Sequence, residues 1–164
     1  MIDSKLKVEQ KDKQLILSRV FQASKELVFQ AYSSCEHLKH WWGPKTWPMD
    51  ECEMDFKVGG TWKYCLRGPN EGDESWGSSV FEEIQRPDKI VYIDHFSDKD
   101  GNVNQEMPSL HITVLFHSEE NGTRITVRVD LDSKQELEKL VEMGMAEGMN
   151  DSWDRLEAYF NKNL

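Results

Sequence analysis

The stretch SKQELEKLVEMGMAEGMNDSWDRLEAYFN, Ser133–Asn161, decides the fold. Its apolar and small residues recur at intervals of three and four, which places them on one face of an α-helix. The residues on this face are Leu137, Leu140, Val141, Gly144, Met145, Gly148, Met149, Ser152, Trp153, Leu156 and Phe160. Ser133 and Glu136 have the spacing of a capping box, which predicts where the helix begins. A helix of this length would span about 40 Å and could cross a whole sheet.

The residues before this helix predict mainly strands. Apolar and polar residues alternate in TWKYCLR (61–67) and in TRITVRVDL (123–131), which is typical of strands with one buried face. Apolar runs predict further strands over residues 14–21, 76–84, 90–96 and 110–117. Two short helices are predicted after the first strand, over residues 23–34 and 36–42, and Gly43-Pro44 ends the second of them.

Together these elements predict an α+β fold in which a large, curved, mostly antiparallel sheet wraps around the long C-terminal helix. The two short helices are inserted after the first strand. A chain of 164 residues suits a single domain. We assign residues 14–163 to this domain and residues 1–13 to an N-terminal extension that is flexible or forms an edge strand.

Charge and composition exclude several classes of partner. The formal net charge of −10 disfavours binding to nucleic acid or to an anionic membrane. No apolar run is long enough to cross a bilayer, and the charged N-terminus lacks the apolar core of a signal peptide, so we expect a cytoplasmic protein. The three cysteines, Cys35, Cys52 and Cys65, have no CxxC spacing, which predicts reduced thiols.

Two glycines, Gly144 and Gly148, lie on the apolar face of the predicted long helix. Each glycine costs about 1 kcal/mol relative to alanine inside a helix. They either allow close packing or a kink, or they leave space for a ligand. Met145 and Met149 lie beside them, and methionine suits pockets that accept varied apolar ligands, although methionine at this spacing is also typical of a plain core.

Four segments, taken in order, resemble a known family. They are HLKHWWGPKTWPMDECEMDFKVGGTWKYCLRGPNEG (37–72), FEEIQRPDKIVY (81–92), GTRITVRV (122–129) and GMNDSWDRLEAYF (148–160). They are similar to the START-like, or polyketide cyclase-like (SRPBCC), superfamily, in the branch that resembles the C-terminal domain of the activator of heat-shock-protein-90 ATPase. The resemblance implies a helix-grip fold with a cavity between the sheet and the last helix. The chain departs from the family where Gly-Trp is common, because Met149 follows Gly148 and the tryptophan is Trp153.

Aromatic residues gather around this implied cavity. We expect the short helix over residues 36–42 and the Gly43-Pro44 turn to lie over the mouth of this cavity as a lid. Trp41 and Trp42 are about 100° apart on a helix, so we expect one to seal the cavity and the other to brace the lid or stay partly exposed. Trp47 is expected to pack on the edge of the sheet. The candidate cavity residues are Trp42, Trp62, Tyr64, Trp76, Tyr92, His95, Met145, Gly148, Met149 and Trp153. The alternative is that most of these aromatic residues form an ordinary core.

The sequence offers little support for a metal site or for catalysis. Cys35, His37 and His40 are close together, but Cys35 points away from the two histidines and no second cluster completes a zinc site, so we expect no metal and no cofactor. His95 shares a strand face with Val91 and Ile93 and is expected to point inward. No catalytic signature is present, and an enzyme would have to rely on His95 and Asp94.

Three functions follow from these observations. The first is binding of a small, largely apolar molecule, aromatic or lipid-like, in the internal cavity. The second, implied by the resemblance, is a chaperone-associated protein of the stress response that modulates a heat-shock-protein-90-type ATPase. The third is a cyclase or hydrolase of polyketide-like substrates. The expected partners are a small molecule and, for the second function, a chaperone, with no nucleic acid and no membrane. The expected state is a monomer or a homodimer.

Overall fold

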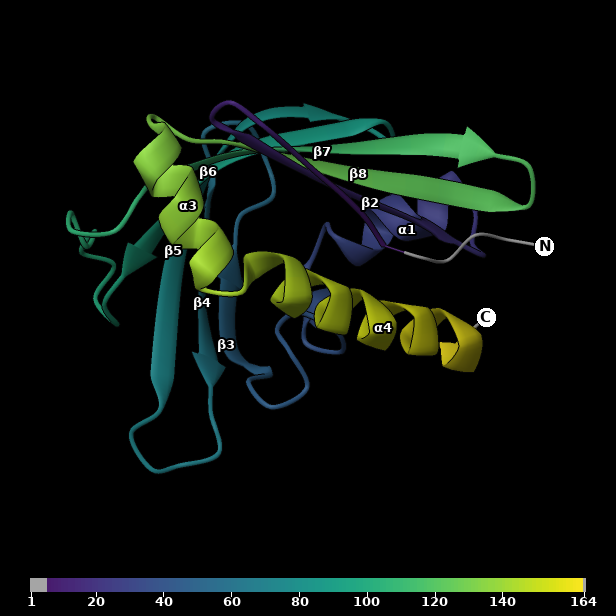
Figure 1. Cartoon of the computed structure of the whole chain (residues 1–164). Helices are drawn as coiled ribbons and strands as arrows, with labels where there is room; N and C mark the ends of the chain where they lie inside the picture. The colour runs from purple at the N-terminus through teal and green to yellow at the C-terminus, as the bar shows by residue number, and fades with distance from the viewer. Residues whose placement is uncertain (1–5, 164) are drawn as a thin grey trace.

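A single curved antiparallel sheet forms the body of the protein in the computed structural model, which describes residues 6–163. The order of the eight strands within these residues is β1-β2-β8-β7-β6-β5-β4-β3. Their bounds are β1 Lys7–Lys11, β2 Gln14–Phe21, β3 Met49–Met54, β4 Thr61–Arg67, β5 Glu74–Gln85, β6 Lys89–Ser97, β7 Leu110–Glu119 and β8 Gly122–Asp130. Figure 1 shows the sheet curving over the last helix, which confirms the predicted α+β helix-grip fold.

The N-terminal extension contributes one strand to this sheet. Residues 7–11 form β1, which pairs with β2 at the edge, and all five of its residues are exposed. Residues 1–5 lie outside the described part of the chain.

Two short helices lie between β2 and β3, as the sequence predicts. Helix α1 spans Lys25–Ala31 and α2 spans Cys35–Leu38. The hydroxyls of Ser24 and Ser34 cap them by accepting hydrogen bonds from backbone N–H groups in the first turn. The segment after α2, residues 39–48, contains the Trp41-Trp42 pair and leads into β3.

The long C-terminal helix is present, but it begins later than predicted, because the segment from residue 133 is divided in two. The structure divides it into α3, Lys134–Glu142, and α4, Met145–Asn163. Gly144 has a φ of +84°, the left-handed conformation with which helices commonly end and which favours glycine because it lacks a Cβ. Gly144 therefore ends α3 and lets the chain turn into α4. Ser133 caps α3 by accepting a hydrogen bond from the backbone N–H of Glu136, at the predicted start.

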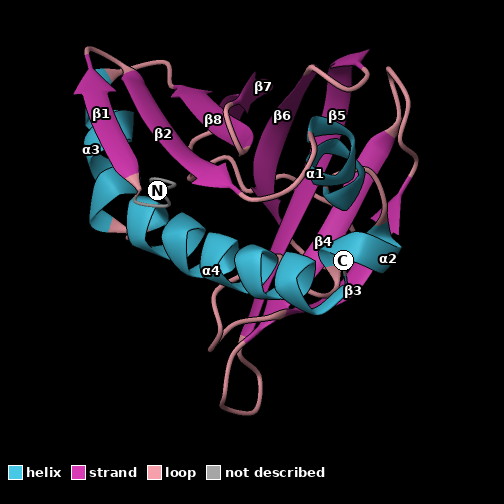
Figure 2. Cartoon of the chain, turned by 90° about the vertical axis from the view of Figure 1, so that its right-hand side faces the viewer, coloured by secondary structure: helices cyan, strands magenta, loops and turns pink. Residues whose placement is uncertain are grey.

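Helix α4 is held on both of its sides. Figure 2 shows it running across the open side of the sheet, between β2 and the α2 segment. Trp153, Leu156 and Phe160 of α4 are buried against the sheet. The strands contribute the alternate residues that face α4 and the short helices: Leu15, Leu17, Tyr92, Leu110, Ile112, Val114, Phe116, Ile125, Val127 and Val129. The alternation predicted for residues 123–131 is therefore the inner face of β8.

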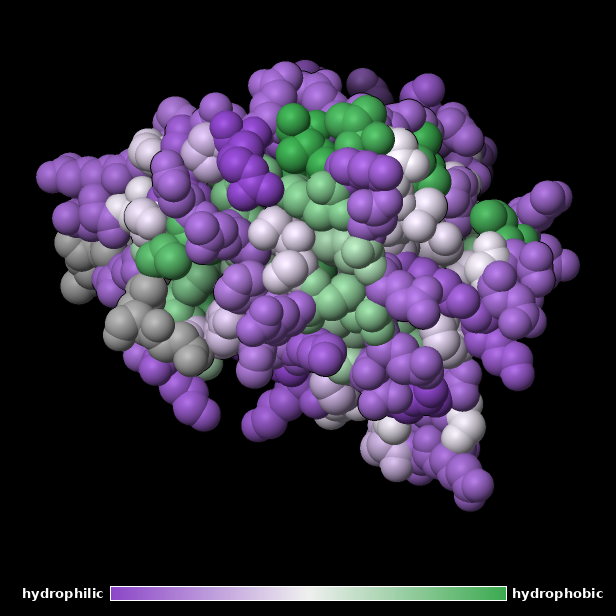
Figure 3. Space-filling model, turned by 180° about the vertical axis from the view of Figure 1, so that it is seen from behind, coloured by the Kyte–Doolittle hydropathy of each residue, from purple (hydrophilic) through white to green (hydrophobic). Residues whose placement is uncertain are grey.

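The outer surface is mostly hydrophilic. Seen from behind, polar and charged side chains cover most of the molecule, and apolar side chains gather in one area among them (Figure 3). This fits a chain in which 30% of the residues are charged. Within residues 6–163, none of the helices has both the length and the apolar character needed to cross a membrane.

The cysteines differ from the expected reduced thiols. Cys35, at the start of α2, forms a disulfide with Cys52 in β3, and Cys65 is free and buried in β4. The fold places α2 beside β3, so the two Cα atoms lie 5.7 Å apart, within the range that a disulfide spans. A separation of 17 residues carries no recognisable motif, which is why the sequence did not indicate the pair. The Trp41-Trp42 segment is therefore attached to the edge of the sheet at both ends: the disulfide holds the helix before it, and the chain after it continues into β3.

We predict that reducing this disulfide lowers the free energy of unfolding by about 3 kcal/mol, because it closes a loop of medium length in the unfolded chain. Urea unfolding with and without dithiothreitol measures the difference. The double variant Cys35→Ser/Cys52→Ser is the control and should unfold identically under both conditions. Alkylation of all three cysteines in the folded or urea-unfolded protein without reductant would show that the bond is not formed.

Candidate functional site

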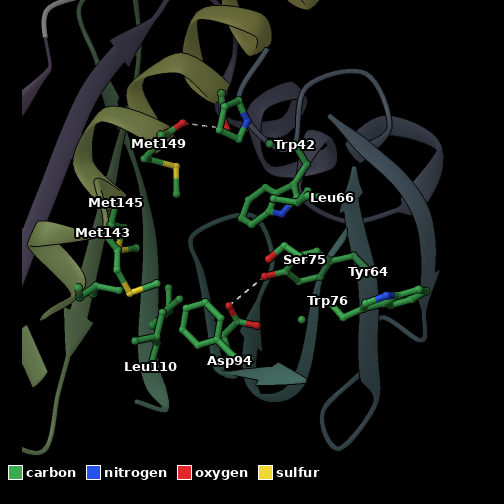
Figure 4. Close-up of a pocket in the computed structure, with 18 of the residues that line it drawn as sticks. Trp42, Tyr64, Leu66, Ser75, Trp76, Asp94, Leu110, Met143, Met145 and Met149 are labelled. Carbon is green, nitrogen blue, oxygen red and sulfur yellow. Dashed lines mark hydrogen bonds between the residues drawn. The ribbon is translucent and has the colours of Figure 1, made fainter. Parts of the chain in front are cut away.

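A pocket of about 270 Å³ lies between the sheet and the helices α3 and α4. Strands β4 to β7 form its floor and one wall, the helices form the opposite wall, and the segment at Trp42–Pro44 covers one side (Figure 4). Its apolar lining consists of Trp42, Pro44, Tyr64, Leu66, Tyr92, Phe96, Leu110, Ile112, Leu140, Met143, Met145 and Met149. The pocket lies at the place where the resemblance implies a cavity.

A cluster of aromatic rings forms the wall beside Trp42. The rings of Trp42 and Trp62 meet edge to face with centroids 4.9 Å apart, and Tyr64 lies 4.7 Å from Trp62. These are the separations that aromatic pairs favour. Trp42 lines the pocket, whereas Trp41 is fully buried behind it and donates its indole N–H to the carbonyl of Ala31 at 3.1 Å. Trp42 therefore faces the cavity and Trp41 braces the lid.

One carboxylate lies at the floor of this apolar pocket. Asp94 of β6 accepts a hydrogen bond at each oxygen, from Tyr64 Oη at 3.0 Å and from Ser79 Oγ at 2.7 Å. Figure 4 shows the contact between Tyr64 and Asp94 facing the cavity. Burial raises the pKa of Asp94 to about 6, and the two hydrogen bonds oppose this shift. Burial also raises the pKa of Tyr64 and Tyr92 well above its usual range, so both hydroxyls stay neutral.

Gly77 allows Tyr64 to reach Asp94. Gly77 pairs with Tyr64 across β4 and β5, and a Cβ at Gly77 would lie 2.4 Å from Cζ of the tyrosine ring. No side chain fits at this distance, so the ring lies directly on the glycine backbone. Any larger residue at position 77 would displace the phenol from Asp94.

The segment that carries Trp42 is fastened to α4 by Arg155. The guanidinium donates hydrogen bonds to the carbonyls of Trp42 at 3.1 Å, Gly43 at 2.8 Å and His40 at 3.3 Å. These carbonyls follow α2, so Arg155 supplies donors to the C-terminal end of a short helix. The backbone N–H of Lys45 donates to Asp151, also on α4. The lid and the helix therefore form one connected wall.

The opposite side of α4 is fastened to β2 by Arg19. This arginine is buried, and its guanidinium contacts Asp154 at 2.8 Å, Glu157 at 2.9 Å and the side-chain oxygen of Asn150 at 3.0 Å. A buried guanidinium needs such partners because charge is costly to remove from water. The neighbouring residues Asp154 and Arg155, in a segment that carries the family resemblance, thus make two structural connections. Asp154 connects α4 to the sheet, and Arg155 connects it to the lid.

Eight of the ten candidate cavity residues line this pocket. They are Trp42, Tyr64, Trp76, Tyr92, His95, Met145, Gly148 and Met149. Trp62 lies behind Trp42, and Trp153 is fully buried, with its indole N–H donating to Tyr32 Oη at 3.1 Å. Trp76 touches the pocket only at its rim: Figure 4 shows its ring pointing away from the cavity, where its N–H donates to Glu74 at 2.8 Å.

His95 lies at the border of the pocket, but its side chain does not point inward as expected. In β6 the inner face carries Ile90, Tyr92 and Asp94, so His95 is on the outer face, where its Nδ1 is 2.8 Å from Ser109 Oγ. Val91 and Ile93 misled the assignment, because these apolar residues lie on the half-buried outer side of the sheet. Asp94, which the sequence also offered as a candidate, provides the polar group at the floor, and the buried Ser79 supports it with a hydrogen bond.

Each of the three residues considered for zinc has another partner in the structure. Cys35 is in the disulfide, His37 Nδ1 is 2.9 Å from Tyr159 Oη, and the ring of His40 stacks on Tyr159 with centroids 4.8 Å apart. Within residues 6–163, no three His, Cys, Asp or Glu side chains are grouped so as to hold a metal ion. At the end of β4, Trp47 packs on Gly68, as expected for the sheet edge.

We predict that Asp94 lowers the free energy of unfolding as the pH rises, because the folded structure partly removes its carboxylate from water. Its pKa is about 6 in the folded state and near 3.8 in the unfolded chain, so between these values the folded state binds more protons. The contribution of Asp94 to the free energy of unfolding is therefore most favourable below about pH 4. It falls by about 3 kcal/mol in total as the pH rises through 6.

Urea unfolding of the protein and of Asp94→Asn across this pH range isolates the effect from that of the other carboxylates. The variant should gain stability relative to the unmodified protein as the pH rises. A difference that does not change with pH would contradict the assignment.

Several solved structures are similar to this chain in both sequence and fold. A solution structure from Arthrobacter aurescens is 31% identical, with a TM-score of 0.87 over 95% of this chain and 91% of that one. A solution structure from Staphylococcus epidermidis is 27% identical, with a TM-score of 0.82 over 96% and 94% of the two chains. A crystal structure from Mycobacterium smegmatis is 25% identical, with a TM-score of 0.85 over 96% of each.

A search of curated proteins finds no match. The family model described as "Activator of Hsp90 ATPase homolog 1-like protein" matches residues 22–161, which include the Trp41-Trp42 segment, the pocket strands and most of α4. The resemblance noted in the sequence is thus confirmed, and the chain belongs to the family of Activator of Hsp90 ATPase homolog 1-like proteins.

Proposed function

We propose that the protein binds a small, largely apolar molecule, with an aromatic or lipid-like body, in the pocket between the sheet and α4. The observation that carries the proposal is the pocket itself, about 270 Å³ with a largely apolar lining. A cavity of about 150 Å³ lined by apolar side chains is enough to bind benzene. The family fold also supports a ligand-binding domain in general.

Gly148 supports this function because neither packing nor backbone geometry requires a glycine there. A Cβ at this position would meet its nearest neighbour, Pro44 Cγ, at 3.7 Å, an ordinary contact. The glycine costs about 1 kcal/mol of helix stability relative to alanine. Its effect is to leave open the side of the pocket between α4 and the lid. Gly144, by contrast, is explained by its positive φ.

Three methionines support a pocket that adapts to its contents. Met143, Met145 and Met149 line the helical wall, and Met143 is 48% exposed at the rim. An unbranched thioether side chain changes rotamer easily and packs well against aromatic rings. The helical wall therefore tolerates ligands of different shape, while the aromatic wall around Trp42 is fixed by its edge-to-face contacts.

We predict that Gly148→Leu weakens ligand binding without destabilising the protein. The probe is 2-(1-naphthyl)ethanol, a neutral bicyclic molecule, and isothermal titration calorimetry measures its affinity. The added side chain occupies ligand space, so affinity should fall about tenfold or more, while a better helix former at this position offsets the strain.

Glu147→Leu is the matched control, because it adds the same side chain one position earlier on the exposed side of α4. This control should bind the probe as the unmodified protein does. Equal affinity in the Gly148 variant, or no binding to the unmodified protein, would reject the proposed function.

A second candidate function comes from the family to which the chain belongs, which is named for an activator of a chaperone ATPase. If it applies, the protein should increase ATP hydrolysis by an Hsp90-type chaperone and bind it in a pull-down. An unchanged rate of hydrolysis at saturating protein would eliminate this function. The result is independent of probe binding, because the pocket lies between sheet and helix and the chaperone would contact the surface.

A further inference from the structure

The pocket contains an acidic group without a basic partner. Among the described residues that line it, Asp94 is the one carboxylate, and none is lysine or arginine. Across residues 6–163, the observed ion pairs link other groups and none includes Asp94. The half-buried carboxylate is held by two neutral hydroxyls. A charge that is partly removed from water is costly and would gain from a cation.

The carboxylate also has room for a further donor. An ionised carboxylate accepts about four hydrogen bonds, and Asp94 accepts one at each oxygen. Tyr64 and Ser79 hold the group in one orientation. The side facing the cavity therefore presents acceptor positions that a ligand can fill.

The surrounding rings favour a cation at the same place. Tyr64 and Tyr92 line the pocket beside Asp94, and Trp42 completes the aromatic wall. The faces of such rings attract ammonium groups, most strongly away from water. A carboxylate ligand would instead meet the charge of Asp94, and the net charge of −10 also favours the approach of cations.

We propose that the ligand is a cationic amphiphile, with an aromatic or other apolar body among the methionines and Trp42 and a protonated amine that pairs with Asp94. The proposal rests on the function proposed for this pocket and specifies its ligand class. Neutral molecules bind in the same place more weakly, and organic acids bind weakest.

Three probes with the same naphthalene body test the ligand class. They are 2-(1-naphthyl)ethylamine, which is a cation, 2-(1-naphthyl)ethanol, which is neutral, and 1-naphthylacetate, which is an anion. At about pH 7.5 calorimetry should show the amine binding about tenfold or more tighter than the alcohol, since a hydrogen bond to a charged group contributes that much. The acetate should bind more weakly than the alcohol.

The variant Asp94→Asn should remove the preference for the amine and leave the affinity for the alcohol within about twofold, as expected for a change that keeps shape. Tyr64→Phe is the matched control, because it removes a donor to Asp94 but keeps the charge and the ring, so the preference should persist. A preference that survives in Asp94→Asn, or equal binding of amine and alcohol to the unmodified protein, overturns the cation proposal while the pocket function stands. No binding of any probe rejects both.

A change of pH tests the same point without a variant. Lowering the pH to about 5 protonates Asp94, whereas the tyrosines are neutral at both pH values and the alkylammonium keeps its charge. Tyr64 of β4 and Tyr92 of β6 are the titratable groups beside Asp94, and β5 presents Ser79. His95 of β6 also borders the pocket, β7 presents apolar side chains, and the helices present apolar side chains and the hydroxyl of Ser152. The advantage of the amine should disappear at the lower pH. An advantage that persists at low pH contradicts the proposal.

Discussion

The hydrogen bonds from Arg155 to the carbonyls of residues 40, 42 and 43 are the interaction on which the rest of the site depends. They attach the lid to α4, and the disulfide between Cys35 and Cys52 attaches the same segment to β3. Arg19 attaches the other side of α4 to β2. The pocket is thus enclosed by elements that are connected in a ring, from sheet to helix to lid and back to the sheet.

This arrangement explains how a protein with a continuous core keeps an open apolar space. The aromatic wall is rigid because its rings contact each other edge to face, and the ring of Tyr64 lies directly on Gly77. The helical wall stays back from the floor because Gly148 has no side chain. Asp94 is the exception in this lining, a carboxylate held in place by Tyr64 and Ser79 at a cost to stability. Such local costs are typical of binding sites, where function overrides the most stable choice of residue.

Much of the fold is predictable from periodicity. The alternation in residues 61–67 and 123–131 gives strands β4 and β8, and the spacing of three and four gives the buried face of α4. The break at Gly144 is not predictable, because a glycine within an apolar helical face fits both a continuous helix and a turn. The disulfide is equally hidden, since the tertiary fold alone brings position 35 beside position 52.

The site is predictable in its composition but not in its orientation. Aromatic and methionine residues around the last helix identify most of the lining. In β6, however, apolar residues occupy both faces, so alternation could not decide between Asp94 and His95. Because the outer face of β6 is half-buried and carries apolar residues, it does not differ enough from the inner face for alternation to identify the side that faces the core.

A crystal structure of the protein with 2-(1-naphthyl)ethylamine is the most direct test of the central claim. The account predicts the naphthalene ring between Trp42 and Met149 and the amine nitrogen about 2.8 Å from an oxygen of Asp94. A pocket that remains empty while the probe occupies another surface would contradict it.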